Sequence, residues 1–226
     1  MKSHSKRYSE SEKTLDRNKT YNFPEAISIL KKVPKVKFDE TVEINIHLNV
    51  DPKNSDQLVR GTVVLPHGTG KKVKVAVFCK GEHEKQAKEA GADYVGAEDL
   101  IDKVAKGFLD FDRAIATPEM MKDLSKLGKV LGPKGLMPSP KAGTVTNNIA
   151  SAIKEVKAGK IEFKTDKQAG IHVGIGKISF AENQLVENAT TLMETIKSLR
   201  PASVKGIFLR SVSIATTMGP GLKINA

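Results

Sequence analysis

A segment near the middle of the chain joins positive charge to residues that break regular structure. It reads GKVLGPKGLMPSPKAGTVT over residues 128–146 and includes Lys129, Lys134 and Lys141 but no acidic residue. Proline removes a backbone donor and glycine loses much conformational entropy on ordering, so a helix or strand tolerates few of either. The segment is therefore predicted to be a loop. It is either an ordinary surface connection or a shaped cationic surface for an anionic partner.

Two stretches far apart in the chain carry groups suited to structured RNA. KKVPKVKFDET, residues 31–41, sets lysines around Phe38 ahead of an alternating apolar stretch, and TTMGPG, residues 216–221, follows a second strand-like stretch. Cations suit phosphates, hydroxyls and free backbone N–H groups suit sugar and base edges, and an aromatic ring packs on ribose or base. If the two strands are antiparallel neighbours, Phe38 and TTMGPG share one edge of a sheet. The plainer alternatives are a core role for Phe38 and a simple type II turn at TTMGPG.

Catalytic and metal chemistry lack a comparable pattern. The single cysteine, Cys79, lies in an apolar run typical of a core residue, and the five histidines are scattered. LPHGTGKKV departs from a phosphate loop, with Leu65 in place of the first glycine and Lys72 in place of the hydroxyl residue. We therefore predict no catalytic residue, no metal site and no cofactor. A nucleotide-dependent enzyme and a general RNA chaperone are the alternatives to a specific RNA-binding protein.

The composition favours a nucleic-acid partner. The 226 residues are 39% hydrophobic, enough for a packed core, and 37 basic against 26 acidic residues give a net charge of +11. Such a charge attracts polyanions. No apolar run approaches the roughly 18 residues of a membrane-spanning helix. The start, MKSHSKRYSESEK, lacks the apolar stretch of a secretory signal, so the chain is expected to be cytoplasmic.

Both ends of the chain carry the pattern of a half-buried sheet. In TVEINIHLNV, apolar residues from Val42 to Val50 occupy every second position, which predicts a strand with one buried face. Residues 1–19 are interpreted as a basic arm or a helix of marginal stability. The other elements predicted at the two ends are helices over 24–33 and 182–199 and strands over 161–166, 170–176 and 206–217.

The middle of the chain alternates strands with helices instead. Strands are predicted over 71–81, 93–96 and 111–119, and helices over 83–91, 97–107, 119–131 and 146–160. This order is typical of βαβ units with a parallel sheet covered on both faces. We therefore expect an α/β protein of two domains: a discontinuous α+β domain from residues 1–67 and 160–226, and an inserted α/β domain over 68–159. Two consecutive domains are the competing layout, and the glycine-rich crossings LPHGTG and KAGK suit a hinge.

Several segments resemble the bacterial ribosomal protein L-one family, which forms the mobile stalk of the large ribosomal subunit. They are GKVLGPKGLMPSPKAGTV, KFDETVE, SDQLVRGTVVLPHGTGK, AGADYVG, IEFKTDK and FLRSVSIATTMGP, in the family's order and across nearly the whole chain. The resemblance implies a noncatalytic protein whose inserted domain is Rossmann-like and joined to the first domain by a hinge. It also implies an RNA-binding, ribosome-associated protein that is a monomer off the ribosome.

The resemblance further implies partners and contact residues. The first domain would bind large-subunit ribosomal RNA, the stalk would touch tRNA leaving the exit site, and the protein would repress translation of its own messenger RNA by binding it. No membrane partner is implied. The family's RNA-contacting positions match Lys37, Phe38, Thr41, Glu43, Lys167, His172, Ser211, Thr217, Met218 and Gly219. The GPKGLMPSPKAG loop is the expected secondary RNA surface, through Gly132, Pro133, Lys134, Gly135, Met137, Pro138 and Lys141.

Physical reasoning assigns roles to several of these residues. A carboxylate repels phosphate, so we expect Glu43 to accept a hydrogen bond from an amino group or a ribose hydroxyl. Met218 is expected to pack by shape, and Thr217 and Gly219 to hydrogen-bond sugar edges through hydroxyl and backbone. Lys134 stands where many family members carry arginine, which keeps the charge but changes the bidentate phosphate geometry.

Overall fold

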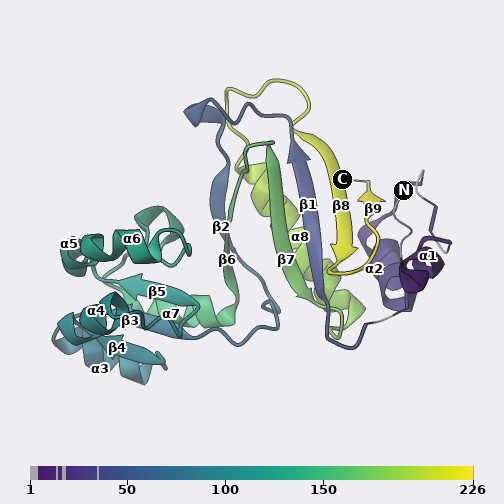
Figure 1. The fold of residues 1–226 in the computed structure, drawn as a ribbon. Coiled ribbons are helices and arrows are strands. Elements are labelled where there is room, and N and C mark those ends of the chain that lie inside the picture. The colour runs from purple at the N-terminus through teal and green to yellow at the C-terminus, as the bar shows by residue number, and fades with distance from the viewer. Residues whose placement is uncertain (1–4, 14, 17–18, 35, 226) are drawn as a thin grey trace. The chain divides into compact units, whose positions relative to one another are not determined.

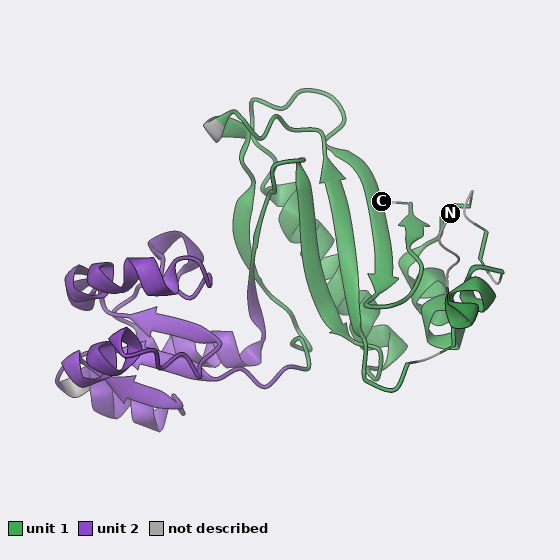
Figure 2. Ribbon diagram, in the orientation of Figure 1, with its two compact units in different colours: residues 1–70, 162–226 green, residues 71–161 purple. Residues whose placement is uncertain are grey.

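The chain forms two compact units (Figure 2). The computed structural model describes residues 5–13, 15–16, 19–34 and 36–225. Unit 1 is Met1–Gly70 with Glu162–Ala226, and unit 2 is Lys71–Ile161. Both crossings of the chain between the units thus lie slightly later than the boundaries predicted from the sequence. The mixed α/β fold class is confirmed.

Unit 1 is built on a four-stranded sheet in the order β7-β1-β8-β9 (Figure 1). Its strands are β1 (Thr41–Leu48), β7 (Gly170–Lys177), β8 (Leu209–Thr216) and β9 (Leu222–Ile224). Every neighbouring pair is antiparallel, and Val42 lies opposite Thr216. The start of the first strand therefore lies beside the end of β8, as expected for these two segments of the sequence.

Two helices cover one face of this sheet. They are α2 (Phe23–Lys32) and α8 (Glu182–Ser198), and in Figure 1 α8 runs behind β7 and β1. The inward residues of β1 alternate strictly with half-buried ones, and Ile44 and Ile46 are at most 1% exposed. Leu185, Leu192 and the other inward residues of α8 complete that core. Burial of one sheet face by an amphipathic helix is the main favourable contribution to the stability of unit 1.

Smaller elements lie outside the main sheet of unit 1, and one of them, β6 (Lys160–Lys164), begins just before the unit boundary. A helix, α1 (Lys6–Lys13), lies near the N-terminus, and a two-stranded sheet pairs β2 (Arg60–Val64) with β6. A short 3-10 turn, η1 (Ser55–Gln57), precedes β2. Strands β2 and β9 (Leu222–Ile224) are not predicted from the sequence pattern. β2 has no clean alternation of burial along its length, and β9 is only three residues long.

Unit 2 contains a three-stranded sheet in the order β4-β3-β5. Its strands are β3 (Val75–Phe78), β4 (Tyr94–Gly96) and β5 (Arg113–Ala116), and both strand pairs are parallel. Ala76 and Phe78 pack in one apolar cluster with α4 (Glu98–Ala105), whereas Val75 and Val77 pack in another with α3 (Glu82–Glu89) and α7 (Ile149–Ala158). The prediction of a parallel sheet covered on both faces is confirmed.

The helix predicted over 119–131 is wrong as a single element. The structure breaks it into η2 (Pro118–Met120), α5 (Met121–Leu124), η3 (Ser125–Leu127) and α6 (Gly128–Leu131), followed by η4 (Pro140–Ala142). The Ser125 hydroxyl donates to the Met121 carbonyl at 2.8 Å, and such a bond to the preceding turn bends helices. Gly128 adds a weak helix former at the next turn.

A further finding concerns the lengths of the helices. In the part of the chain that the structure describes, no helix combines the length and the apolar character needed to cross a bilayer.

Candidate nucleic-acid interface

The face of the unit 1 sheet opposite α2 and α8 carries polar and small side chains. We call it the open face and define it by residues of three strands. On β1, the alternation that buries Val42 and Ile44 points the intervening residues the other way. The residues of the open face are Thr41, Glu43, Asn45 and His47 of β1, His172 and Gly174 of β7, and Ser211, Ser213 and Ala215 of β8.

Strand register sets these residues in rows across the sheet. Asn45 lies between His172 and Ser213, and Glu43 lies between Gly174 and Ala215. Glu43 thus has the two smallest side chains of the open face as its neighbours. Because both neighbours are small, the Glu43 carboxylate projects beyond them and is accessible to a flat, polar partner. This position fits the acceptor role expected of Glu43.

At one end of the open face lies a second group of predicted residues, Lys37, Phe38, Thr217, Met218 and Gly219, which we call the corner. The Phe38 side chain is 55% exposed and that of Met218 is 51% exposed. A core role for Phe38, the plainer alternative, is therefore wrong. The two chain segments meet there, because the Thr217 N–H donates to the Thr41 carbonyl and the Thr41 N–H donates to the Thr217 hydroxyl, each at 3.0 Å.

The turn at the corner is held by hydrogen bonds within the protein. The Met218 N–H donates to Glu40 Oε1 at 2.9 Å, and the Gly219 N–H donates to the Thr216 carbonyl at 3.1 Å. The expectation that free backbone N–H groups of this loop meet RNA is therefore wrong for residues 217–219. What the turn offers a partner is the exposed Met218 side chain. Glycine is required at 219, because a Cβ there would lie 2.3 Å from the Thr216 hydroxyl oxygen.

The opposite end of the open face carries Lys167 in a tight turn before β7. Asp166 Oδ1 accepts from the N–H groups of Gln168 at 2.7 Å and Gly170 at 2.6 Å. These backbone donors, Gly170 first, hold the pKa of Asp166 below its ordinary value. Lys167 is exposed on this turn. The two predicted lysines, Lys37 and Lys167, thus lie at opposite ends of β1 and its neighbours.

His172 connects that turn to the middle of the open face. Its Nδ1 lies 2.7 Å from Asn45 Oδ1, and its Nε2 lies 3.5 Å from Asp166 Oδ2. A shallow cavity of about 190 Å³ surrounds it, lined by Asn45, Ile46, His47, Asp166, Gln168, Gly170, His172, Ser211 and Ser213. Asn45, His47 and Ser213 line this cavity as well, although they are not among the residues predicted from the sequence. The alternation that identified Glu43 continues through Asn45 and His47, so the signal was present.

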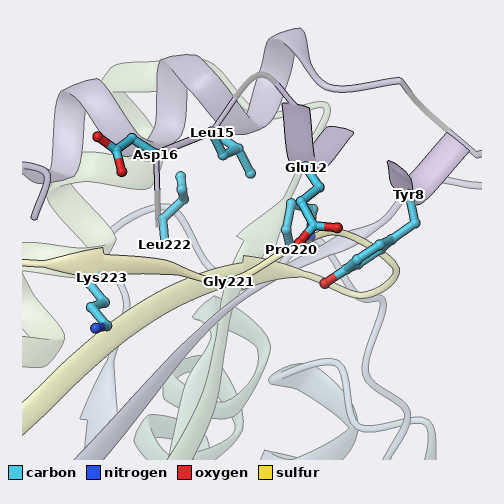
Figure 3. A pocket seen from close by; sticks show the side chains of 8 residues that line it. All are labelled: Tyr8, Glu12, Leu15, Asp16, Pro220, Gly221, Leu222 and Lys223. Carbon is cyan, nitrogen blue, oxygen red and sulfur yellow. The ribbon is translucent and has the colours of Figure 1, made fainter. Parts of the chain in front are cut away.

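Helix α1 approaches the corner from the N-terminal side. The Arg7 guanidinium donates to the Met218 carbonyl at 2.6 Å and to the Pro34 carbonyl at 3.3 Å. Beside it lies a pocket of about 330 Å³, which Figure 3 shows from close by. It is lined by Tyr8, Glu12, Leu15, Asp16, Pro220, Gly221, Leu222 and Lys223. Helix α1 therefore contacts the corner through Arg7, and residues of the N-terminal segment line this pocket together with residues 220–223.

The predicted secondary surface in unit 2 divides into exposed and anchoring residues. Gly132, Pro133, Lys134, Gly135 and Lys141 are exposed. Pro138 is buried and Met137 packs against an apolar cluster of unit 2, so these two side chains hold the loop in place. Its end is fixed by a parallel bridge between Ala116 and Val145. The segment is mostly a loop, as predicted, with one turn of helix at α6 and a 3-10 turn at η4.

The single thiol is buried, and the metal-ligating side chains that the structure describes do not gather into a site. Cys79 is fully buried, and burial raises its pKa to about 11, which keeps the thiol protonated at neutral pH. Among the described residues, no group of three or more histidine, cysteine or acidic side chains is placed to hold a metal ion.

These features define a class: a mixed α/β protein of two units, one of which presents a polar sheet face that no described helix covers. The chain belongs to the Ribosomal protein L1p/L10e family, whose model matches residues 30–220. It is 56% identical to the large ribosomal subunit protein uL1 of Thermosipho melanesiensis over 226 residues, which are all of this chain and 97% of that protein.

Other relatives carry the same name. The large ribosomal subunit protein uL1 of Thermosipho africanus is 58% identical over 226 residues, all of this chain and 97% of the relative. That of Protochlamydia amoebophila is 58% identical over 221 residues, 98% of this chain and 94% of the relative. The family resemblance predicted from the sequence is confirmed. So is the prediction that the chain is not an enzyme, because this is a family of structural ribosomal proteins.

Proposed function

We propose that this protein is a structural constituent of the large ribosomal subunit that binds large-subunit ribosomal RNA at the mobile stalk. Its relatives are named as large-subunit proteins, and its net charge of +11 suits a polyanionic partner. The binding surface is the open face together with the corner. The protein works there by recognition alone, without chemistry on the RNA.

One observation carries this proposal: residues from both chain ends gather on a single sheet face. Thr41 and Glu43 come from the N-terminal segment, and Ser211 and Thr217 come from the C-terminal one, on adjacent strands in register. His172 joins them from β7. Such a surface has hydroxyls and acceptors in its middle and a lysine at each end. It suits the wide, shallow groove and the 2′-hydroxyls of folded RNA more than a deep helical groove.

Two finer parts extend the proposal, one for each of the two predicted surfaces. A structure in the protein's own messenger RNA that resembles the ribosomal site would compete for the open face, so binding it represses translation when ribosomal RNA is scarce.

The exposed lysines of unit 2, Lys134 and Lys141, give a second cationic surface that contacts exit-site tRNA and assists its release. Messenger binding would use the open face and the corner, and tRNA contact would use the GPKGLMPSPKAG loop of unit 2.

A titration tests the proposal. The protein is titrated with a stalk-junction RNA and with a scrambled duplex of equal length, at several salt concentrations. We expect the junction RNA to bind about a thousandfold or more tightly, with a log-log salt slope set by the phosphates contacted. Equal affinities for the two RNAs would identify a general RNA chaperone. Tight binding of a mononucleotide would favour the enzyme alternative.

A competition experiment shows whether the junction RNA and the messenger fragment bind the same surface of the protein. The proposal expects a fragment of the protein's own messenger to displace the junction RNA from the open face. Simultaneous binding of both RNAs would contradict a shared site. A transfer RNA should bind in the presence of either RNA, because unit 2 provides its contact.

A further inference from the structure

We propose that Glu40 is a positioning residue for RNA recognition: its buried carboxylate fixes the backbone of Met218 and so presets the corner. Neither the sequence motifs nor the resemblance assigns a role to this residue. The inference rests on the proposed RNA-binding function. It identifies what holds the recognition turn, as distinct from what touches the RNA.

Hydrogen bonds of Glu40 hold the backbone of the corner in place. The residue lies immediately before β1 and is 5% exposed. Its Oε1 accepts from the Met218 N–H at 2.9 Å, while its own carbonyl accepts from the Ile178 N–H at 2.9 Å. The backbone of Glu40 is thereby tied to the end of β7 and its side chain to the turn after β8. A single residue thus connects three segments that meet at the corner.

The burial of Glu40, at 5% exposed, argues against a contact role. A carboxylate repels phosphate, and burying one is costly unless hydrogen bonds to it compensate. A protein that needed only affinity for RNA would place an apolar or basic residue beneath this turn. Hydrogen bonds from a backbone N–H to a carboxylate are stronger than those to a neutral acceptor. The physical benefit of Glu40 is therefore a firmly held Met218 peptide.

Met218 is held on its other side as well. Its carbonyl oxygen accepts from Arg7 at 2.6 Å, and the neighbouring N–H groups of Thr217 and Gly219 are bonded to Thr41 and Thr216. The backbone of residues 217–219 consequently has a defined conformation before any RNA arrives. A recognition turn that is already ordered loses less entropy on binding, which raises affinity for the one RNA shape that fits it. Nonspecific binding through lysines gains nothing from this order.

The test compares two substitutions at one position. Glu40→Ala removes the acceptor, and Glu40→Gln keeps an oxygen acceptor without the charge. We expect Glu40→Ala to lower affinity for the stalk-junction RNA by about tenfold or more, the scale of one charge-assisted hydrogen bond, with no change for the scrambled duplex. Glu40→Gln is expected to stay within about threefold of the unmodified protein, because the amide oxygen still accepts from the Met218 N–H.

A second readout does not depend on RNA. Hydrogen exchange of the Met218 amide, followed by NMR, should be slow in the unmodified protein and in Glu40→Gln, and fast in Glu40→Ala. The amide of Ile44 in β1 serves as the control for intact folding in all three. Slow Met218 exchange in Glu40→Ala would overturn the proposal, as would equal loss of junction-RNA affinity in both variants.

The two readouts also separate this inference from the function on which it rests. If the unmodified protein does not discriminate the junction RNA from the scrambled duplex, the proposed function fails. The exchange rates then show by themselves whether Glu40 holds the turn: protection lost only in Glu40→Ala supports that role, and protection kept there refutes it.

Discussion

The four-stranded sheet of unit 1 and the three-stranded sheet of unit 2 are exposed in different ways. In unit 2 all four residues of β3 are buried, because helices cover both faces of the parallel sheet. In unit 1 buried and half-buried residues alternate along the whole of β1. A sheet covered on both sides can offer a partner only its loops and strand ends. A sheet covered on one side offers side chains in register, at spacings that the hydrogen-bond ladder fixes.

This contrast suggests a division of labour between the two units. The open face can provide specificity, since its groups stand at fixed positions in a rigid ladder. The loop of unit 2 offers lysines and backbone around two anchoring side chains, Met137 and Pro138, and suits charge-based contact. If this division holds, recognition resides in the open face and the corner, while unit 2 contributes mainly charge.

The largest effect is expected from the core of unit 2. Phe78 is fully buried and packs edge-on against Phe111, with ring centroids 6.5 Å apart. Phe78→Ala should lower the free energy of unfolding of unit 2 by about 3–5 kcal/mol, because it leaves a cavity. Amide exchange of β3 and β5 in increasing urea measures this loss. Affinity for the stalk-junction RNA should stay unchanged, and Phe78→Leu should cost less. A parallel loss of RNA affinity would break the division of labour.

The second-largest effect is expected on RNA discrimination, from a substitution in the middle of the open face. Glu43→Gln replaces an anionic acceptor by an amide, and we expect discrimination between the junction RNA and the scrambled duplex to fall by about tenfold. Affinity for the scrambled duplex should not fall. Glu194→Gln, on the exposed side of the helix that covers the other sheet face, is the matched control. Equal losses for both RNAs would refute the acceptor role of Glu43.

A smaller effect is expected from the cationic loop. The double substitution Lys134→Ala with Lys141→Ala should reduce junction-RNA affinity by less than about threefold, and it should lower the salt slope by at most about 0.9 for each phosphate that is no longer neutralised. The double substitution Lys37→Ala with Lys167→Ala, at the ends of the open face, should reduce affinity more. Titrations at several salt concentrations provide both quantities. The reverse ranking would place the main site in unit 2.

The smallest effect follows from the acid in the turn before β7. The N–H groups of Gly170 and Gln168 lower the pKa of Asp166 in the folded protein. The stabilisation of this turn is therefore fully present above the unfolded-state pKa and is lost as the pH falls through the lower folded-state pKa. We expect the Gly170 amide resonance to show an acid shift whose midpoint lies below the ordinary aspartate pKa of about 3.9. Asp166→Asn should abolish that shift. A midpoint at or above the ordinary value would contradict this assignment.

Much of the fold follows from periodicity, and the exceptions have physical causes. The alternation in β1 and the apolar runs of β3 and β5 identify these strands, since a half-covered and a fully covered sheet leave different patterns. β2 and β9 escape detection because β2 lacks a regular alternation of burial and β9 is only three residues long. The helix over 119–131 fails because a hydroxyl and a glycine break it locally, which an average over the segment conceals.

Sequence patterns predict even less of the candidate site, because its supporting contacts join residues far apart in the chain. Residue type and motif point to Phe38, Glu43 and Met218, but not to the contact that holds them. Glu40 differs from Glu43 only in falling on the buried side of the alternation, and its partner Met218 lies at the far end of the chain. A support of this kind depends on tertiary proximity, which local sequence patterns do not encode.

The order of the strands has a consequence for synthesis of the protein. β1 leaves the ribosome early, yet both of its neighbours in the sheet, β7 and β8, are translated after the whole of unit 2. Domains fold as units while the chain grows, so the inserted unit can mature while β1 waits unpaired. A product that stops short of β8 would contain a folded inserted unit but would lack the β8 side of the open face. If the open face binds RNA as proposed, such a shortened product lacks the surface needed for incorporation into the ribosome.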